Sequence, residues 1–324
     1  MSASASAPFR LVSWNVEWFD RLFGDDRLDL SEAWSARYEV TRRQQAEAIA
    51  HVLRRLDADA VLVVEAPDDG PRRSTVKALE GFAAWAGLRA SRTALGFPNH
   101  TRQEIALMHD PARVAARHAP GDHPGAPRFD GIHEESAWSK PPLELDLVTP
   151  LGDLRLIGVH AKSKSTNGAA PGETTQVAIA NRRKQLAQCA WLAGRARARI
   201  VEGVPLIVAG DFNDGPGLDA FEALFGRSGV EIVLAAGLHD PHAVPPRLGG
   251  AAPTTARFWD NRNERWLNAL LDFAMVSAPL AKRASWRILH PFDDPEAAAD
   301  PALRQALLDA SDHFPVVLDL APAP

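Results

Sequence analysis

The chain has 324 residues, a length that fits one large domain or two ordinary ones. Apolar residues make up 46% of it and charged residues 24%, the usual balance of a globular protein with a buried core. The net charge of −5 excludes a global positive field that would draw the protein onto nucleic acid, so any such contact has to be local.

The cysteine content and the N-terminal sequence indicate in which compartment the protein acts. Cys189 is the single cysteine, which excludes an intramolecular disulfide, a cysteine-rich zinc site and a thioredoxin-like pair. It fits a reducing compartment, and we expect a cytoplasmic protein with no obligate protein partner. Residues 1–8 lack the basic and apolar segments of a signal peptide, so we expect a disordered tail there. No apolar run approaches the ~20 residues of a membrane span, so we expect no membrane contact.

Strand-like and helix-like patterns alternate along the chain. In order, they predict a strand at 9–16, a polar surface loop at 20–38, a helix at 41–56, a strand at 60–64, a helix at 74–85, a strand at 104–108, a long loop at 118–142, a strand at 154–159, a helix at 175–199, and strands at 205–209, 271–276 and 315–320. No linker or repeat divides them, which indicates a single α/β domain from residue 9 to residue 321.

Polar side chains gather where the apolar strands stop or start. They are Asn15, Glu17, Glu65, His160, Asp211, Asn213, Asp272, Asp312 and His313. Each of them alone has an ordinary structural explanation: Glu65 as a cap or turn residue, Asp312 and His313 as part of a loop, and Asn15 as a hydrogen-bond partner of a neighbouring strand. Because α/β sheets place their ligands at strand ends, one pocket could collect the whole set.

The motifs that contain these residues resemble those of one known family. They are Trp14-Asn15-Val16-Glu17, Glu65, His160, Gly210-Asp211-Phe212-Asn213, Leu271-Asp272-Phe273 and Ser311-Asp312-His313. In this order, over nearly the whole chain, they resemble the endonuclease/exonuclease/phosphatase superfamily of DNase I-like, metal-dependent phosphoesterases. The resemblance implies a four-layer α/β sandwich, in which two packed mixed sheets are flanked by helices.

Phosphoester hydrolysis explains why such residues would be needed. A phosphate repels an attacking hydroxide, so a divalent cation has to neutralise its charge, and hard Mg²⁺ or Mn²⁺ prefers oxygen ligands. Glu65 is our first choice of metal ligand, with Glu17 and Asp312 beside it and Asn15 close by, as the resemblance also implies. One departure is Val64, which replaces the glutamine usually found before the metal glutamate and leaves the support of Glu65 open.

The remaining members of the set are candidates for proton transfer and phosphate binding. The resemblance implies that Asp211 activates or orients the attacking water, with Asn213 holding the water or the phosphate. His313 can donate to phosphoryl oxygens or act as a base, Asp272 would orient it, and His160 would be a second donor. Whether Asp211 or His313 moves the proton stays open.

The substrate is less clearly indicated than the chemistry. Lys162, Lys164, Arg182 and Arg183 could border a groove for a phosphate backbone. The cations and aromatic residues between Arg257 and Trp266 can stack on bases, or can equally pack on their own domain. The leading hypothesis is a metal-dependent nuclease acting on DNA or RNA with little sequence preference. The alternatives are a phosphatase or phosphodiesterase on a small molecule or lipid head group, and a non-catalytic binding protein.

Overall fold

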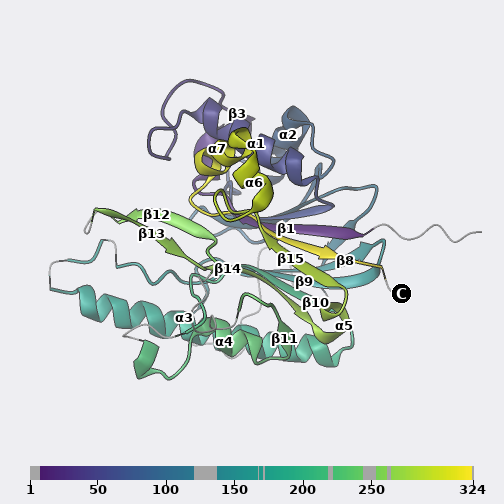
Figure 1. Ribbon diagram of the computed structural model, residues 1–324, viewed down its shortest axis with the longest axis vertical. Helices are drawn as coiled ribbons and strands as arrows, with labels where there is room; N and C mark the ends of the chain where they lie inside the picture. Colours follow the sequence, from purple (N-terminus) through teal and green to yellow (C-terminus); the bar gives the residue numbers. More distant parts are fainter. Residues whose placement is uncertain are drawn as a thin grey trace, which may run out of the picture.

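A computed structural model describes residues 8–119, 137–166, 168–170, 172–217, 222–243, 253–260 and 264–322. Two six-stranded mixed sheets pack face to face, and helices cover their outer faces (Figure 1). This is the four-layer α/β sandwich that the sequence predicts, and the prediction is confirmed. The tail expected at residues 1–8 lies, apart from Pro8, outside the described residues.

The two sheets have the same number of strands and a parallel pair near the middle of each. The first sheet has the order β15 (Ala284–Ile288), β16 (Val316–Leu320), β1 (Phe9–Asn15), β4 (Ala60–Ala66), β6 (Glu104–His109) and β5 (Arg92–Leu95). The second has the order β11 (Leu238–His239), β14 (Asp272–Ser277), β10 (Leu206–Asp211), β9 (Gly152–His160), β8 (Leu143–Thr149) and β7 (Ala115–His118).

Helices on each outer face bury the side of the sheet that the other sheet does not cover. On the first sheet lie α1 (Arg42–Leu56), α2 (Thr75–Ala86), α6 (Pro295–Ala299) and α7 (Pro301–Ala310), and on the second lie α3 (Thr174–Val201) and α4 (Gly229–Leu234). A short helix, α5 (Ala278–Ala281), follows β14. None of the helices in the described part of the chain is long and apolar enough to cross a membrane.

A dry layer of aliphatic side chains holds the two sheets together. Leu62 of β4 and Ile105 of β6 face the second sheet at Gly158 of β9. A Cβ atom added at Gly158 would lie 2.7 Å from Leu62 Cδ1 and 3.2 Å from Ile105 Cγ2, closer than van der Waals contact allows. Glycine at this position therefore lets the two sheets pack together without displacing Leu62 and Ile105.

The topology brings six strand ends to one edge of the sandwich. β1 runs parallel to β4, and β9 runs parallel to β10, so four carboxyl ends lie at this edge. β14 and β16 run antiparallel to their neighbours, so their amino ends lie there too. In the second sheet Asp211 is register partner to both His160 and Asp272. Residues far apart in the sequence therefore become neighbours.

Most of the elements that the sequence did not predict are short or lie at sheet edges, but β8 lies inside the second sheet and α7 has ten residues. The unpredicted elements include β5, β7, β8, β11 and β15, together with α4, α6 and α7. The predicted surface loop at 20–38 contains a 3-10 turn at Phe19–Leu22 and a small ribbon of β2 (Phe23–Gly24) and β3 (Arg27–Leu28). A second 3-10 turn spans Glu222–Leu224, and β12 (Ala256–Asp260) and β13 (Arg265–Ala269) form a separate hairpin. Most of the loop predicted at 118–142 lies outside the described residues.

Candidate active site

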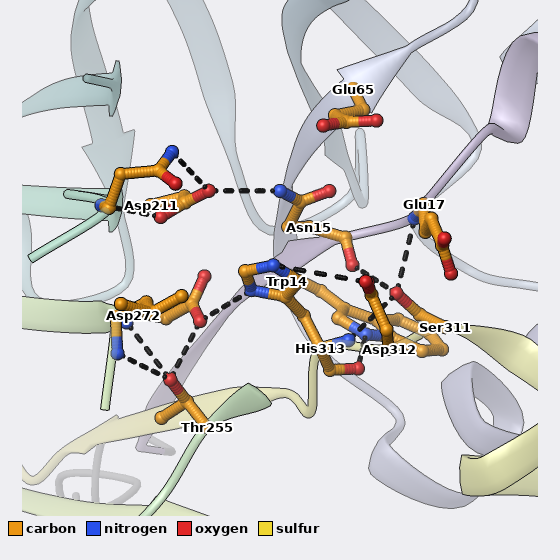
Figure 2. Close-up of polar contacts among 12 residues, drawn as sticks. Trp14, Asn15, Glu17, Glu65, Asp211, Thr255, Asp272, Ser311, Asp312 and His313 are labelled. Carbon is orange, nitrogen blue, oxygen red and sulfur yellow. Dashed lines mark hydrogen bonds and ion pairs between the residues drawn. The ribbon is translucent and has the colours of Figure 1, made fainter. Parts of the chain in front are cut away.

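The acidic part of the site is built on the ends of β1 and β4. Asn15 is the last residue of β1, and Glu17 follows it on the same face. Glu65 lies in a β-bulge of β4 with a left-handed φ of 63°, a conformation rare for a residue with a side chain. The bulge turns its carboxylate toward Asn15 (Figure 2). Bulges of this kind recur where a strand has to redirect a functional side chain.

Ser311 ties the end of β1 to the start of β16. Its hydroxyl donates to the carbonyl oxygen of Asn15 at 2.8 Å and accepts from the backbone N–H groups of Glu17 and His313, each at 3.1 Å. The indole Nε1 of Trp14 donates to the carbonyl oxygen of His313 at 2.9 Å. These buried bonds fix Asp312 and His313 against β1 (Figure 2).

His313 belongs to a three-residue relay. Its Nδ1 donates to Asp272 Oδ2 at 2.8 Å, and the acceptor sets the tautomer of the neutral ring. Thr255 Oγ1 donates to the same carboxylate oxygen at 2.7 Å. The Thr255 oxygen in turn accepts from the N–H groups of Leu271 and Asp272 at 2.9 and 3.0 Å. These bonds hold the imidazole at its Nδ1 atom, so that Nε2 points toward the site.

Asp211 receives donors from both sheets. Asn15 Nδ2 and Asn213 Nδ2 donate to its Oδ2 at 3.1 and 2.9 Å, and the Asn213 N–H donates to its Oδ1 at 2.7 Å. Gly210, just before it, has a φ of 134°, and a Cβ there would lie 2.1 Å from the Val159 carbonyl oxygen. Glycine is therefore required for the approach of β9 that places Asp211 beside its neighbours.

His160 and Lys140 complete the cluster from the second sheet. Lys140 Nζ lies 2.9 Å from His160 Nε2, which is 3.5 Å from Asp211 Oδ2 and 3.9 Å from Glu65 Oε1. Burial and the Lys140 charge lower the pKa of His160 well below its usual value, so its ring is neutral at pH 7. Burial also lowers the pKa of Lys140, although Glu65 and Asp211 oppose the shift.

The carboxyl groups of the site share one electrostatic signature. Burial raises the pKa of Glu17, Glu65 and Asp312. Burial, reinforced by the charge of Asp272, raises the pKa of Asp211 to about 7. For His313, burial favours the neutral ring, but Asp272 outweighs it and raises the pKa well above its usual value. When ionised, the five carboxylates Glu17, Glu65, Asp211, Asp272 and Asp312 carry more negative charge than the neighbouring Arg37, Lys140 and His313 neutralise.

That surplus is the reason to consider a cation. Asn15 Oδ1 and Asp312 Oδ1 are buried without a hydrogen-bond partner among the described residues, although Asp312 Oδ1 lies 3.9 Å from His313 Nε2. Both oxygen atoms belong to the predicted ligand set. Glu17 is bonded to Arg37, from the loop predicted at 20–38. A second group, Asp211, Asp272 and His313, has its potential ligand atoms within 4.8 Å of one another. Because His313 and Asp272 are already bonded to each other, this group forms a hydrogen-bonded relay, and the oxygen-rich set beside it suits Mg²⁺ or Mn²⁺ better.

The four predicted substrate-binding cations lie in different surroundings. Lys164 Nζ contacts Asp214 and Glu222, each at 2.7 Å, and Arg182 is buried with one guanidinium nitrogen 3.3 Å from the Ala178 carbonyl oxygen. Arg183 is exposed on α3 and Lys162 is half-buried. The structure therefore leaves Lys162 and Arg183 better placed for an external phosphate than the other two.

Three polar residues of the site were not singled out from the sequence. Lys140 and Thr255 are described above, and Gln103 Nε2 donates to Glu65 Oε2 at 2.7 Å. Gln103 directly precedes β6, the antiparallel neighbour of β4, so it lies beside the bulge. In the sequence, each of these residues is only a polar residue close to a strand. Such residues are common in any protein, so they do not mark a site. Only the pairing of strands reveals these contacts.

Comparisons with known proteins agree with this architecture. The Endonuclease/Exonuclease/phosphatase family matches residues 12–313 of the chain. Comparison with curated protein sequences finds no match.

Three solved structures similar to this chain share 13–15% identity with it, a level that shows the fold alone. TDP2 from C. elegans is 15% identical, with a TM-score of 0.55 over 99% of this chain and 78% of its own. The 3′ phosphatase NExo from Neisseria, bound to product DNA hairpin, is 13% identical, with a TM-score of 0.54 over 96% of this chain and 99% of its own. An AP endonuclease from Archaeoglobus fulgidus is also 13% identical, with a TM-score of 0.54 and the same coverage. With its fold and the match over residues 12–313 in agreement, the chain belongs to the endonuclease/exonuclease/phosphatase family.

Proposed function

We propose that the protein is a divalent-metal-dependent phosphodiesterase that cleaves DNA or RNA with little sequence preference, and that it acts in the cytoplasm. One observation carries the catalytic part: the His313–Asp272 pair and the half-buried acids Glu65, Glu17 and Asp312 lie at one edge, with Asn15 between them. A phosphoester needs both a proton donor and charge neutralisation, and this edge offers the groups for both. The DNA-bound NExo structure supports nucleic acid as the substrate class.

Asp211 is the proposed acceptor for the proton of the attacking water. A general base works best with a pKa near the working pH, and the pKa of Asp211 is about 7. Asn15 and Asn213 hold the carboxylate in place through its Oδ2 atom. These contacts favour Asp211 over His313 as the base.

His313 is the proposed donor to the phosphoryl oxygens. Its raised pKa keeps it protonated at pH 7, and Asp272 and Thr255 fix the direction of its ring. Neutral His160 contributes a second polar nitrogen beside Asp211, and Lys140 adds positive charge at the same place. Lys162 and Arg183 are the proposed contacts to phosphates farther along the strand.

Glu65, Glu17, Asp312 and Asn15 are the residues that would hold Mg²⁺ or Mn²⁺. When bound, such a cation neutralises charge on the phosphate and on the leaving group. Glu17 would exchange part of its contact with Arg37 for this role.

The test is hydrolysis of supercoiled plasmid, end-labelled single strands, RNA, and a small phosphodiester and phosphomonoester. Each is incubated with Mg²⁺ or Mn²⁺, with EDTA as the metal control. Digestion of nucleic acid that is lost in Asp211→Asn and His313→Ala supports the proposal, and product length separates endonuclease from exonuclease action. Turnover of small esters alone would favour the small-molecule alternative. No turnover, with no metal-induced rise in Tm, would leave a non-catalytic binding protein.

A further inference from the structure

The β12–β13 hairpin carries an unusual set of exposed aromatic side chains. Its strands pair antiparallel, and Trp259 lies directly opposite Trp266, with ring centroids 5.4 Å apart. The two side chains are 45% and 50% exposed. The hairpin projects from the edge of the sandwich below α7, away from the two large sheets (Figure 1). Burial in the domain's own core therefore does not explain these tryptophans.

The side chain of Arg257 lies in the same surface. The Arg257 guanidinium lies 4.7 Å from the ring centroid of Trp266 and 5.1 Å from that of Phe292, which is 47% exposed. Within the described part of the chain, Arg257 has no carboxylate at ion-pair distance, and its Nε is buried without a hydrogen-bond partner. Trp259, Trp266, Arg257 and Phe292 form what we call the aromatic layer, which carries an unneutralised positive charge.

The aromatic layer is continuous with the catalytic edge. The backbone N–H of Arg257 donates to the Asp312 carbonyl oxygen at 2.7 Å, and Ala256 pairs with His313 as an isolated bridge. Thr255, one residue earlier, holds Asp272. The hairpin thus starts at the residues that orient His313, and a ligand lying along it leads directly to them.

We infer that the aromatic layer is a stacking surface for unpaired nucleotide bases that flank the phosphate at Asp211 and His313; this rests on the proposed nuclease function. Base stacking on aromatic rings tolerates any sequence because every base has a π face, and an arginine adds attraction for the polyanionic strand. In a duplex, neighbouring base pairs cover those faces. The aromatic layer therefore selects single strands, or ends and junctions where bases are unstacked.

The sequence that connects β12 to β13 argues against a lipid surface as the occupant. A segment that inserts into a membrane needs apolar residues, whereas the sequence that connects β12 to β13 reads Asn261-Arg262-Asn263-Glu264. Every residue in it is polar or charged. A nucleic-acid strand lying next to Arg257 is consistent with this polar sequence.

The experiment measures binding of a labelled single-stranded oligothymidylate and of a duplex of matched length, in EDTA so that no cleavage occurs. The variants are Trp259→Ala and Trp266→Ala, and Trp85→Ala is the matched control, because Trp85 is 40% exposed on α2 and outside the aromatic layer. We expect each hairpin variant to weaken single-strand binding roughly 5- to 150-fold, the range for loss of one base stack. Duplex binding and hydrolysis of a small phosphodiester should stay at the level of the Trp85 control.

Three outcomes would overturn the inference, and they are distinguishable. If the wild type cuts nucleic acid but both hairpin variants bind and cut single strands normally, the stacking surface is wrong while the proposed function stands. If the wild type hydrolyses small esters only, the proposed nuclease function fails and the inference fails with it. If the variants lose binding to anionic phosphatidylserine vesicles but keep binding to single strands, the aromatic layer is a membrane contact instead.

Discussion

The two ends of strand β4 carry carboxylates in opposite electrostatic states. Asp59, just before the strand, accepts from the Arg10 backbone N–H at 2.8 Å and from Arg89 Nη1 at 2.6 Å, and it also pairs with Arg113. Burial opposes its charge, but these bonds lower its pKa. Glu65, at the other end, has a raised pKa because burial outweighs the opposing charge of Lys140, and Gln103 is its side-chain donor.

This difference separates the stabilising end of the sandwich from the functional end. Paired charges at the Asp59 end stabilise the fold, since each donor and acceptor there has a partner. At the Glu65 end the fold keeps negative charges together without enough cations, which costs stability and favours binding of a divalent cation. The predictions below test this division.

The largest expected effect is on catalysis at the Glu65 end. Asp211→Asn and His313→Ala should each lower kcat for a phosphodiester by about 10²–10⁴-fold, because one removes the proton acceptor and the other the charged donor. Steady-state kinetics with matched protein concentrations measure this. Thermal denaturation of the same proteins should show smaller changes than Asp59→Ala. A variant that is less stable but keeps the wild-type kcat when folded would contradict the assignment of Asp211 or His313 to catalysis.

At the opposite end, the expected effect is on stability alone. Asp59→Ala should lower the free energy of unfolding by about 3 kcal/mol, since it leaves the Arg10 N–H, Arg89 and Arg113 without their shared acceptor. Urea denaturation measures the change. At a temperature where the variant is folded, its kcat should match the wild type, and a large kcat loss there would break the division between the ends.

Glu65→Gln tests the cost of the unneutralised charge. A carboxyl whose pKa is raised by folding contributes its full stability below its unfolded pKa and loses it as pH rises. At pH 8 the neutral amide should therefore raise the Tm of the metal-free protein, with little difference at pH 4. The Mg²⁺-induced rise in Tm should be lost in the variant. A variant that keeps the full metal-induced rise would show that Glu65 is not a ligand.

The pH dependence of kcat/KM follows from the same groups. Ionised Asp211 accepts a proton, so the rate should rise about tenfold per pH unit below pH 7 and level off above it. It should fall again at higher pH, where His313 loses the proton that Asp272 stabilises. Activity on a small diester over pH 5–10 measures both limbs, and a flat profile between pH 5 and 7 would exclude Asp211 as the base.

The site residues that the sequence singled out share a property that their partners lack. Asn15, Glu65 and Asp211 each come at the end of a largely apolar strand, so strand periodicity and the parallel topology place them at one edge. Lys140 reaches His160 across 20 residues of sequence, and Gln103 reaches Glu65 across 38. No local pattern encodes these contacts, because they depend on which strands pair and on the bulge at Glu65.

Edge elements escaped prediction for a related reason. β5 and β7 have one partner strand each, and their residues are only partly buried, so their apolar alternation is weak. The β12–β13 hairpin forms a separate two-stranded sheet, joined to the rest of the fold by an isolated bridge between Ala256 and His313. Its sequence is compatible with either a packed loop or a stacking surface. Exposure of Trp259 and Trp266 favours the second alternative.

Val64 left open how Glu65 is held, and Gln103 offers the answer. Because Glu65 lies in a bulge at a strained φ, the 2.7 Å bond from Gln103 Nε2 is what we expect to hold its carboxylate toward Asn15. Asn99 Nδ2 in turn donates to the Gln103 carbonyl oxygen at 3.1 Å and to Glu104 Oε2 at 3.2 Å, which anchors the loop.

Gln103→Leu should therefore weaken Mg²⁺ binding about tenfold, as loss of a bond to a metal ligand commonly does. Calorimetric titration measures the Kd for Mg²⁺ directly. Gln305→Leu is the matched control, since Gln305 likewise donates to a carboxylate, Asp309, at 2.8 Å on the surface of α7. With saturating Mg²⁺, kcat of Gln103→Leu should return close to the wild-type value, because Gln103 acts on the orientation of Glu65 and not on the reacting atoms. A loss of kcat that excess Mg²⁺ does not restore would mean that the bond supports the whole strand end, and the contrast between Asp59 and Glu65 would then be one of packing as well as charge.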